Sequence, residues 1–338
     1  MRKRVDIDLV IPMVFPGDAQ WQKVYGRYHT GDPRRNVRFR SWDTEELLVR
    51  CCMKYLPWLR CIHILLSGES QVQGWMTDMG ALGWQDDDAL EAELGRWQVR
   101  LQRRMARLFR LHGGAERGIR IRLVYHRDFI PEEHLPCFSS PCIEMFLHRI
   151  PGLAEHFIYA NDDMFPLSPL EEGDFFRRQD GVFLPCQQLN EIPFPTRPTI
   201  FHRSCMGGLN MVAAPFGVQF SNRYLKNGHS FAPYLKSSCE EVWRRHGGQI
   251  LKNLSPLRRT ADSYNQYLYA YYQHLAGLEI PHAPREQYVG KNTLTEELAG
   301  IIRDPEAGIV CLNDNESIGN WRQRAEIVRR EIGEKLKD

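Results

Sequence analysis

Apolar residues gather in short, nearly continuous runs that are separated by polar loops and by segments with helical periodicity. Such a run predicts a β-strand that is covered on both faces, because a strand with one wet face would alternate apolar and polar residues. The pattern predicts buried strands at 6–14, 61–66, 119–125 and 157–160. Strands that alternate with helices are typical of an α/β fold, so this is the fold class that we expect.

Helix-start signals fall between these strands. Asp43 is the expected N-cap of a helix over 43–55. Ser139 or Ser140 is the expected N-cap of a helix over 141–149, whose first turn accepts a proline because the missing N–H has no partner there.

Two further helices are expected in the second half of the chain. One covers 233–246, and the other is a terminal amphipathic helix. The apolar side of the terminal helix consists of Ile318, Trp321, Ala325, Val328 and Ile332.

A long helix is expected from Asp86 to Leu111, inside residues 80–118, which we interpret as a helical insertion. Leucine and tryptophan side chains recur along one side at three- and four-residue steps, or at sums of these steps. The other side is basic and carries Arg96, Arg100, Arg103, Arg104, Arg107 and Arg110. This face is either solvated or in contact with an anionic polymer or membrane surface.

Acidic and polar side chains follow two of the predicted strands. Asn161-Asp162-Asp163 ends the strand at 157–160, while His126 and Asp128 end the strand at 119–125. Ligands of α/β sheets bind at the carboxyl ends of strands. Adjacent carboxylates repel each other unless a cation or water separates them. An isolated Asn-Asp-Asp would be an ordinary acidic turn, but the two clusters together favour a metal–phosphate site.

The segments around this turn resemble the central region of a known family. The matching runs are His126-Arg-Asp-Phe-Ile-Pro, Leu135-Pro-Cys-Phe-Ser-Ser-Pro-Cys-Ile-Glu144, His148-Arg-Ile-Pro-Gly-Leu and Phe157-Ile-Tyr-Ala-Asn-Asp-Asp. They are similar to the Stealth proteins, which include the capsular polysaccharide phosphotransferases and the lysosomal-enzyme N-acetylglucosamine-1-phosphotransferase.

The resemblance implies a Rossmann-like, glycosyltransferase-A-like mixed sheet flanked by helices. The whole chain, 1–338, would then be a single Stealth-type catalytic domain. The 80–118 insertion, with its long basic helix, departs from the shorter connection that we expect in the family. Residues 180–230 alternate short apolar runs with Pro and Gly, and we expect residues 180–260 to form a smaller acceptor-side lobe.

Further matches imply substrate contacts. Asp18 fits a family turn in which Phe15 replaces an aspartate, and Arg38 and Arg50 are either anion ligands or surface arginines. The expected substrate-binding residues are Asp18, Arg38, Arg50, Ser139, Ser140, Glu144, His148, Arg149, Asn161 and Asn313.

The implied reaction moves hexose-1-phosphate from a nucleotide sugar, which we expect to be UDP-linked, to a glycan hydroxyl in capsular or exopolysaccharide synthesis. Phosphoryl transfer needs a divalent cation, arginines and a base. The expected ligands of Mg²⁺ or Mn²⁺ are Asp162, Asp163 and Asp314, because hard cations prefer oxygen. The expected catalytic residues are His126, Asp128, His229, Arg258 and Asp262, with either histidine as the base.

Two other functions fit the same residues. A metal-dependent glycosyltransferase would use the acidic turn to transfer sugar without phosphate. A glycan-binding relative without catalytic activity is also conceivable, given Phe15.

Composition narrows the choice of partner and compartment. The chain has 44 Lys and Arg against 42 Asp and Glu, so its overall charge gives no argument for a nucleic-acid partner. Nine cysteines without a Cys-x-x-Cys motif are typical of buried thiols in a reducing compartment. No apolar run approaches the roughly 20 residues of a membrane-spanning helix. We therefore expect a cytoplasmic protein with possible peripheral contact at the inner face of the membrane.

Overall fold

A six-stranded sheet forms the centre of the computed structural model, which describes residues 5–84, 118–314 and 319–337. The strand order is β11-β5-β1-β2-β4-β3, and every neighbouring pair is parallel except β11 with β5. The strands are β1 Ile7–Pro12, β2 Cys61–Leu66, β3 Leu82–Gly83, β4 Arg120–Tyr125, β5 His156–Tyr159 and β11 Ala232–Leu235. All four predicted strands are therefore confirmed.

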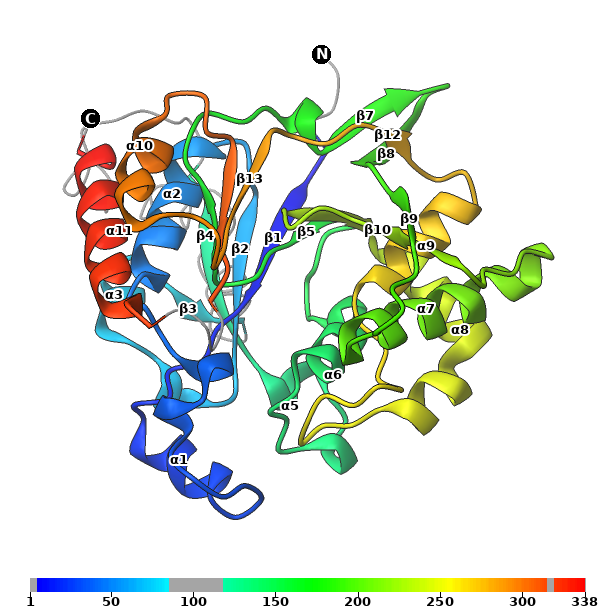
Figure 1. Ribbon diagram of the computed structural model, residues 1–338, viewed down its shortest axis with the longest axis horizontal. Helices are drawn as coiled ribbons and strands as arrows, with labels where there is room; N and C mark the ends of the chain where they lie inside the picture. The colour runs from blue at the N-terminus through cyan, green and yellow to red at the C-terminus, as the bar shows by residue number, and fades with distance from the viewer. Residues whose placement is uncertain (1–4, 85–117, 315–318, 338) are drawn as a thin grey trace, which may run out of the picture.

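Helices cover both faces of this sheet (Figure 1). One face packs against α2 (Glu45–Tyr55), α10 (Leu298–Arg303) and α11 (Trp321–Lys335), and the other against α7 (Ile200–Ala213), α8 (Lys236–Asn253) and α9 (Tyr267–Leu275). Successive strand residues enter opposite cores: Leu9 and Ile11 join one core and Val10 joins the other. Two covered faces explain why the strands are continuous apolar runs.

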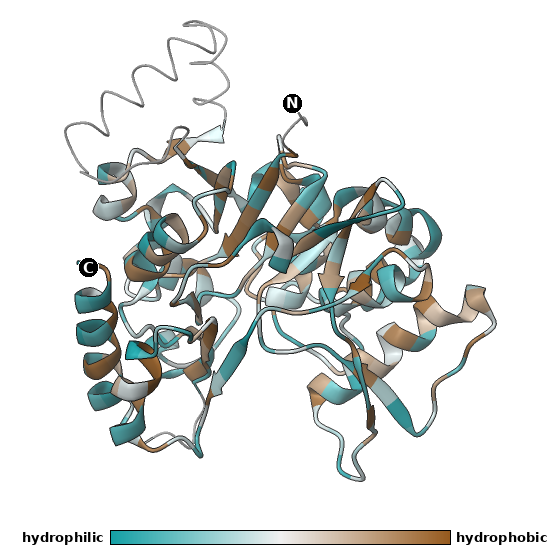
Figure 2. Ribbon diagram, turned by 90° about the horizontal axis from the view of Figure 1, so that it is seen from above, coloured by the Kyte–Doolittle hydropathy of each residue, from teal (hydrophilic) through white to brown (hydrophobic). Residues whose placement is uncertain are grey.

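The tyrosines of α9 and the apolar side of α11 are core residues. Tyr269 and Tyr271 are fully buried. The banded colouring of α11 in Figure 2 reflects its amphipathic sequence, and Ala325, Val328 and Ile332 are its buried side. Among the described helices, none is long and apolar enough to cross a membrane.

Three predicted helix boundaries are wrong. Thr44, and not Asp43, precedes the first residue of α2, and Asp43 instead has a positive φ and contacts Arg329. The helix expected over 141–149 is shorter: α6 is Ser140–Met145, and a 3-10 turn follows. Residue 233 belongs to β11 and not to a helix, because the edge of a sheet tolerates a proline.

Other predictions on these elements remain open. The basic helix expected at 86–111, with its arginine face, lies outside the described residues. Residues 180–260 contain β9 (Asn190–Pro193), α7, β10 (Arg223–Lys226), β11 and α8, and their role as an acceptor-side lobe remains a prediction. The same holds for the glycosyltransferase-A likeness.

Asp8 forms a buried ion cluster at the amino end of the central strands. Its carboxylate accepts hydrogen bonds from Arg60, from His63 at 3.0 Å and from the Ala154 backbone at 2.8 Å. Burial alone would raise the pKa of Asp8, but these bonds lower it to about 2. Burial opposes the charged imidazole, yet Cys61 and the bond to Asp8 raise the pKa of His63 to about 9. The cluster joins β1 and β2 and plays a structural role.

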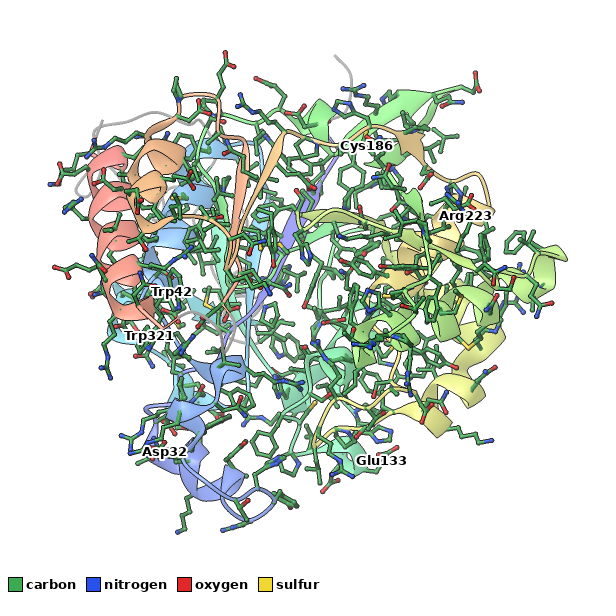
Figure 3. The ribbon with its side chains drawn as sticks, in the orientation of Figure 1. Asp32, Trp42, Glu133, Cys186, Arg223 and Trp321 are labelled. Atoms are coloured by element: carbon green, nitrogen blue, oxygen red, sulfur yellow. The ribbon has the colours of Figure 1, made fainter. Side chains whose placement is uncertain are left out.

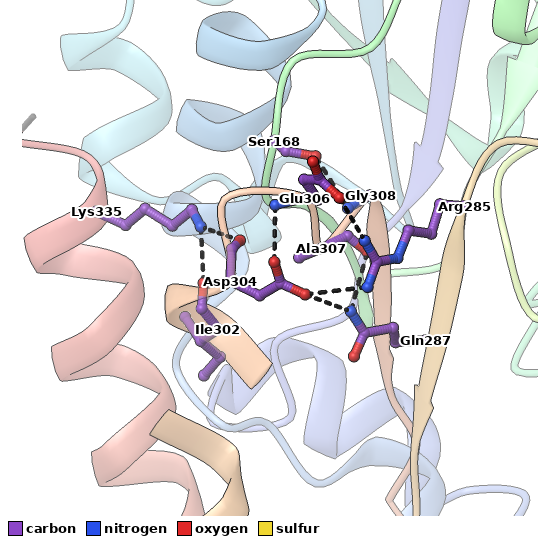
Figure 4. Close-up of polar contacts among 9 residues, drawn as sticks. All are labelled: Ser168, Arg285, Gln287, Ile302, Asp304, Glu306, Ala307, Gly308 and Lys335. Carbon is purple, nitrogen blue, oxygen red and sulfur yellow. Dashed lines mark hydrogen bonds and ion pairs between the residues drawn. The ribbon is translucent and has the colours of Figure 1, made fainter. Parts of the chain in front are cut away.

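A smaller sheet of order β13-β14-β6 stands beside the central one, with β13 at Glu286–Val289, β14 at Ile309–Leu312 and β6 at Met164–Pro166. A polar network fixes the end of this sheet where β13 and β14 begin (Figure 4). Asp304 accepts hydrogen bonds from Arg285 and Gln287, and the Gly308 N–H donates to Ser168 at 2.9 Å. Gly308 has φ +69°, and a Cβ there would lie 2.1 Å from the Arg285 carbonyl oxygen.

Replacing Gly308 with alanine should destabilise the protein. A left-handed conformation costs a non-glycine residue roughly 1–2 kcal/mol, and the clash with the Arg285 backbone adds to this. Urea unfolding should therefore show a loss of about 2 kcal/mol or more. The matched control is Gly300→Ala in α10, where no atom lies within 4 Å and where alanine should stabilise by roughly 0.5–1 kcal/mol. Equal stability of both variants would contradict the expectation.

Candidate active site at the acidic turn

The acidic turn lies at the carboxyl edge of the central sheet, where β5 gives way to β6. The Met164 N–H donates to the Asn161 carbonyl at 3.3 Å and closes the turn. Because β6 runs antiparallel to β14, the start of β6 meets the end of β14. The Leu312 N–H donates to the Asp163 carbonyl at 2.7 Å, so Asp314 follows β14 directly beside the turn. Two Asn-Asp segments that are distant in sequence thus lie side by side.

Asp162 and Asp163 form an uncompensated pair. Burial, together with the charges of Asp163 and Glu45, raises the pKa of Asp162 to about 8. Burial raises the pKa of Asp163 to about 6, with Asp314 adding to the effect. Asp163 Oδ1 is buried and has no hydrogen-bond partner, while Oδ2 lies 3.7 Å from the Cys311 thiol. A cation would relieve both the mutual repulsion and the unsatisfied oxygen.

Asp314 has protein partners of its own. Arg40 donates to both of its carboxylate oxygens, and the Trp42 indole N–H donates at 3.1 Å. The Arg40 guanidinium also lies 4.8 Å from the Trp321 ring centroid, and the two tryptophans are labelled in Figure 3. Asp314 is therefore neutralised within the protein.

A divalent cation fits Asp162 and Asp163 better than all three aspartates. Within residues 5–84, 118–314 and 319–337, no three His, Cys, Asp or Glu side chains gather closely enough to hold a metal ion. Mg²⁺ commonly binds one or two carboxylates together with substrate phosphates and water. Two uncompensated carboxylates match that requirement, with the substrate completing the site.

A second polar group adjoins the turn through Tyr159. The Tyr159 hydroxyl lies 3.0 Å from Asn161 Oδ1 and 3.3 Å from Glu144 Oε1. Burial raises the pKa of Glu144, while Arg259 and the Gln266 N–H oppose that rise. Arg259 also donates to the Ser140 hydroxyl at 2.9 Å. A guanidinium held this close to the acidic turn is suited to bind phosphate oxygens.

The expected catalytic residues differ in their surroundings. His126 is buried at the carboxyl end of β4, and burial lowers its pKa to about 4. Asp128 accepts the Tyr125 N–H at 2.7 Å and so caps its own short helix. His229 is half-buried, and its ring lies 4.9 Å from that of Tyr288. Arg258 and Asp262 are exposed.

Several expected substrate contacts have local structural roles. Asp18 caps α1 (Ala19–Tyr25), and exposed Arg50 pairs with Glu46 one helical turn away. Arg38 is exposed on a 3-10 turn. The Ser139 hydroxyl is buried without a hydrogen-bond partner, so it remains a candidate for a ligand contact.

Of the other expected substrate contacts, His148 and Arg149 lie toward the amino edge of the central sheet, and Asn313 lies at the carboxyl edge. His148 and Arg149 lie against the Trp243 ring of α8, at 5.4 and 5.1 Å. Lys236, at the amino edge, adds to the burial that lowers the pKa of His148 to about 4. This places the pair away from the acidic turn. The Asn313 N–H donates to the Val289 carbonyl at 2.9 Å, so Asn313 does lie beside the turn.

Sequence reasoning missed Arg40, Glu45 and Arg259. Arg40 lies two residues after Arg38, and Arg259 is the immediate neighbour of Arg258. Glu45 begins α2, where an acidic residue is expected from the helix dipole alone. Only long-range pairing reveals the role of each.

Asp162→Asn should stabilise the protein without divalent cations. A carboxyl with a raised folded-state pKa binds its proton more tightly when folded, so ionisation destabilises the fold as pH rises from about 4 to about 8. At pH 8 the variant should gain about 1 kcal/mol or more in thermal unfolding, and at pH 4 the gain should vanish. Mg²⁺ should raise the melting temperature of the wild type only. A variant less stable than wild type at pH 8 would contradict this reading.

Comparison with known proteins gives one consistent result. Residues 115–183 match the family described as Stealth protein CR2, conserved region 2. The chain is 25% identical over 297 residues to the capsular polysaccharide phosphotransferase LcbA of Aeromonas hydrophila, covering 83% of this chain and 70% of that protein. It is 27% identical over 308 residues to the capsular polysaccharide phosphotransferase fcs1 of Haemophilus influenzae, covering 88% and 70%.

A longer alignment extends over nearly all of the chain. The exopolysaccharide phosphotransferase cps2G of Lactiplantibacillus plantarum is 24% identical over 361 aligned residues, covering 98% of this chain and 94% of that protein. The matched family region contains His126, Ser140, Glu144 and the acidic turn. On these grounds, residues 115–183 carry the Stealth conserved region 2, and the chain is similar over most of its length to capsular and exopolysaccharide phosphotransferases.

Proposed function

We propose that this protein is a sugar-1-phosphate transferase of capsular or exopolysaccharide synthesis. It would move hexose-1-phosphate from a nucleotide sugar, which we expect to be UDP-linked, to a hydroxyl of a glycan acceptor. The observation that carries the proposal is the uncompensated pair Asp162 and Asp163 beside the Ser140–Glu144–Arg259 group, in a relative of named polysaccharide phosphotransferases.

The reaction exchanges one phosphorus–oxygen bond for another. The acceptor oxygen attacks the phosphorus that carries the sugar, the bond from that phosphorus to the bridging oxygen breaks, and nucleoside monophosphate leaves. Asp162 and Asp163 would hold Mg²⁺ or Mn²⁺, which supplies positive charge for the phosphate oxygens. Arg259 would bind phosphate oxygens directly, held in place by Ser140.

A base must accept the proton of the acceptor hydroxyl. His126 is neutral near pH 7, but a pKa of about 4 makes it a weak base. His229 is half-buried, and its ring lies beside that of Tyr288, which belongs to β13, the strand that pairs with β14. Burial, together with the charge of Lys226, also lowers the pKa of His229. His229 is the stronger candidate because of its access and position, and His126 is the alternative.

The compartment is part of the proposal. All nine cysteines are buried free thiols, which suits a reducing environment such as the cytoplasm. Peripheral contact with the inner face of the membrane or with an anionic polymer would depend on the arginines of 86–111. A nucleic-acid partner is not part of the proposal.

Asp162→Asn and Asp163→Asn should each lower phosphodiester formation at least 100-fold while the protein stays folded, since either change removes a carboxylate from the proposed cation site. Transfer is measured by ³¹P NMR after a screen of nucleotide sugars with Mg²⁺ or Mn²⁺. A glycosidic product without phosphorus would instead identify a glycosyltransferase. The control is Asp180→Asn, an exposed residue with φ 52°, a conformation that asparagine tolerates. Wild-type rates in both site variants would contradict the proposal.

Arg259→Lys should lower turnover about 10-fold or more, because lysine keeps the charge but loses the planar fork that matches phosphate oxygens. Arg258→Lys is the matched control and should stay within twofold of wild type, since Arg258 is exposed. The measurement is kcat and KM for the donor. The reverse ranking of the two variants would assign the anion contact to Arg258.

A further inference from the structure

A cavity of about 180 Å³ lies between the end of β8 (Val182–Gln187), the loop that joins β10 to β11, and the start of β13. Cys186, labelled in Figure 3, belongs to its wall. The lining is rich in uncharged polar side chains and has one carboxylate. The polar side chains are those of Gln187, Gln188, Asn190, Asn227, Ser230 and Glu286.

β13 runs from Glu286 in the cavity wall toward the acidic turn. Glu286 and Tyr288 point to the same face of this strand because side chains alternate. Tyr288 is paired with Cys311, whose thiol lies 3.7 Å from Asp163 Oδ2. His229, from the loop that lines the cavity, completes the path with its ring 4.9 Å from that of Tyr288.

The register sets the separation between the cavity and the turn. Glu286 pairs with Ile309, three residues before the end of β14. Three residues span roughly 10 Å along a strand. A chemical group bound in the cavity is thus too far from the acidic turn to react there. It is close enough that another part of the same molecule can reach the turn.

The lining favours a neutral sugar over a phosphate or nucleotide. Among the described residues of this lining, none is Lys or Arg, and Glu286 would repel an anion. Amide side chains both donate and accept hydrogen bonds, as sugar hydroxyls do. Tyr288 is 51% exposed and offers an aromatic face at the exit. Ligand pockets for drug-sized molecules measure roughly 300–1,000 Å³, so this smaller cavity suits one ring rather than a nucleotide sugar.

Hydrogen bonds and ion pairs of the lining residues and their neighbours hold the walls of the cavity. Gln187 donates to the Ala270 carbonyl at 2.9 Å and fixes the end of β8. Arg285, next to Glu286, is directed to Asp304 and Glu306 (Figure 4), so its charge is compensated on the far side of the strand end. Asn190 pairs with Lys226 across β9 and β10, which positions the loop at Asn227. These contacts give the cavity a fixed shape before any ligand arrives.

We propose that this cavity binds one neutral sugar residue of the glycan acceptor, remote from the hydroxyl that receives the phosphoryl group. The identification of the ligand as an acceptor rests on the proposed function; the identification of a saccharide site rests on the lining. Binding energy from such a remote group raises acceptor affinity and orients the reacting end. The subsite would favour acceptors of several sugars over single sugars.

Gln188→Trp tests the proposal by filling the cavity from an exposed position. The control is Gln179→Trp, an equal change at an exposed position of β7 (Phe176–Gln179). A Gln188→Ala, Asn190→Ala double variant removes the amides without adding bulk. Saturation-transfer NMR without donor uses methyl glycosides of hexoses and N-acetylhexosamines as probes. Steady-state kinetics then compare acceptors of one sugar and of three or more sugars.

Both cavity variants should lose the saccharide signal and raise the KM of longer acceptors at least 10-fold, while kcat on a one-sugar acceptor stays within twofold. The Gln179 control should match wild type in both measurements. Absence of any saccharide signal from the wild type, or an unchanged signal and KM in both cavity variants, overturns the subsite. Competition by inorganic phosphate for the same signal would likewise overturn it. If the wild type forms no phosphodiester but the cavity variants still lose the saccharide signal, the saccharide site stands and the proposed function is rejected. If the wild type forms the phosphodiester but the cavity variants leave the KM of longer acceptors unchanged, the proposed function stands and the sugar subsite is rejected.

Discussion

The antiparallel pairing of β14 with β6 is the constraint on which the candidate site depends. In this pairing Cys311 lies opposite Met164, and the Leu312 N–H donates a hydrogen bond to the Asp163 carbonyl. Closing so long a loop costs conformational entropy, but the cost rises only with the logarithm of loop length. Burial of Val310 and Phe165 in the core offsets it. β13 then adds to β14, so the same pairing also positions Tyr288 and the cavity near the acidic turn.

Charge compensation around the turn is selective. Four carboxylates meet there, and the protein provides partners for two of them: Arg40 and Trp42 for Asp314, and Ser41 for Glu45. Asp162 and Asp163 receive no cationic partner among the contacts of the described residues. The folded protein therefore keeps unfavourable electrostatics at Asp162 and Asp163, while hydrogen bonds and an ion pair stabilise Asp314 and Glu45 nearby. In the proposed function, such a site would attract a cation, and the cation would stabilise a phosphoryl group without later reorganisation.

Local pattern predicted the strands and the acidic turn but not their partners. Continuous apolar runs indicated covered strands because both faces of the sheet are in fact packed. The sequence did not determine where α2 begins, because Asp43 and Thr44 are both residue types that cap helices. In the structure Thr44 precedes α2, and Asp43 contacts Arg329. The arginine at 259 could not be distinguished from its neighbour, since only the packing of the 255–266 loop directs one of them to Ser140. The loop at Phe15 is fixed through its backbone, because Gln71 accepts from the Phe15 N–H and donates to the Phe15 carbonyl.

The histidines on the central strands show how burial assigns roles. His63 lies in β2 and His126 directly follows the neighbouring strand β4; both are buried, yet burial and neighbours place their pKa values at about 9 and about 4. A carboxylate next to His63 keeps it charged, whereas apolar surroundings keep His126 neutral. A proton acceptor is most effective when its pKa lies near the working pH, and neither residue meets this condition. His229 is half-buried and adjoins the acidic turn through Tyr288, so it has both the access and the position that the two buried histidines lack. For the proposed reaction, access and position therefore favour His229, in the loop between β10 and β11, as the base.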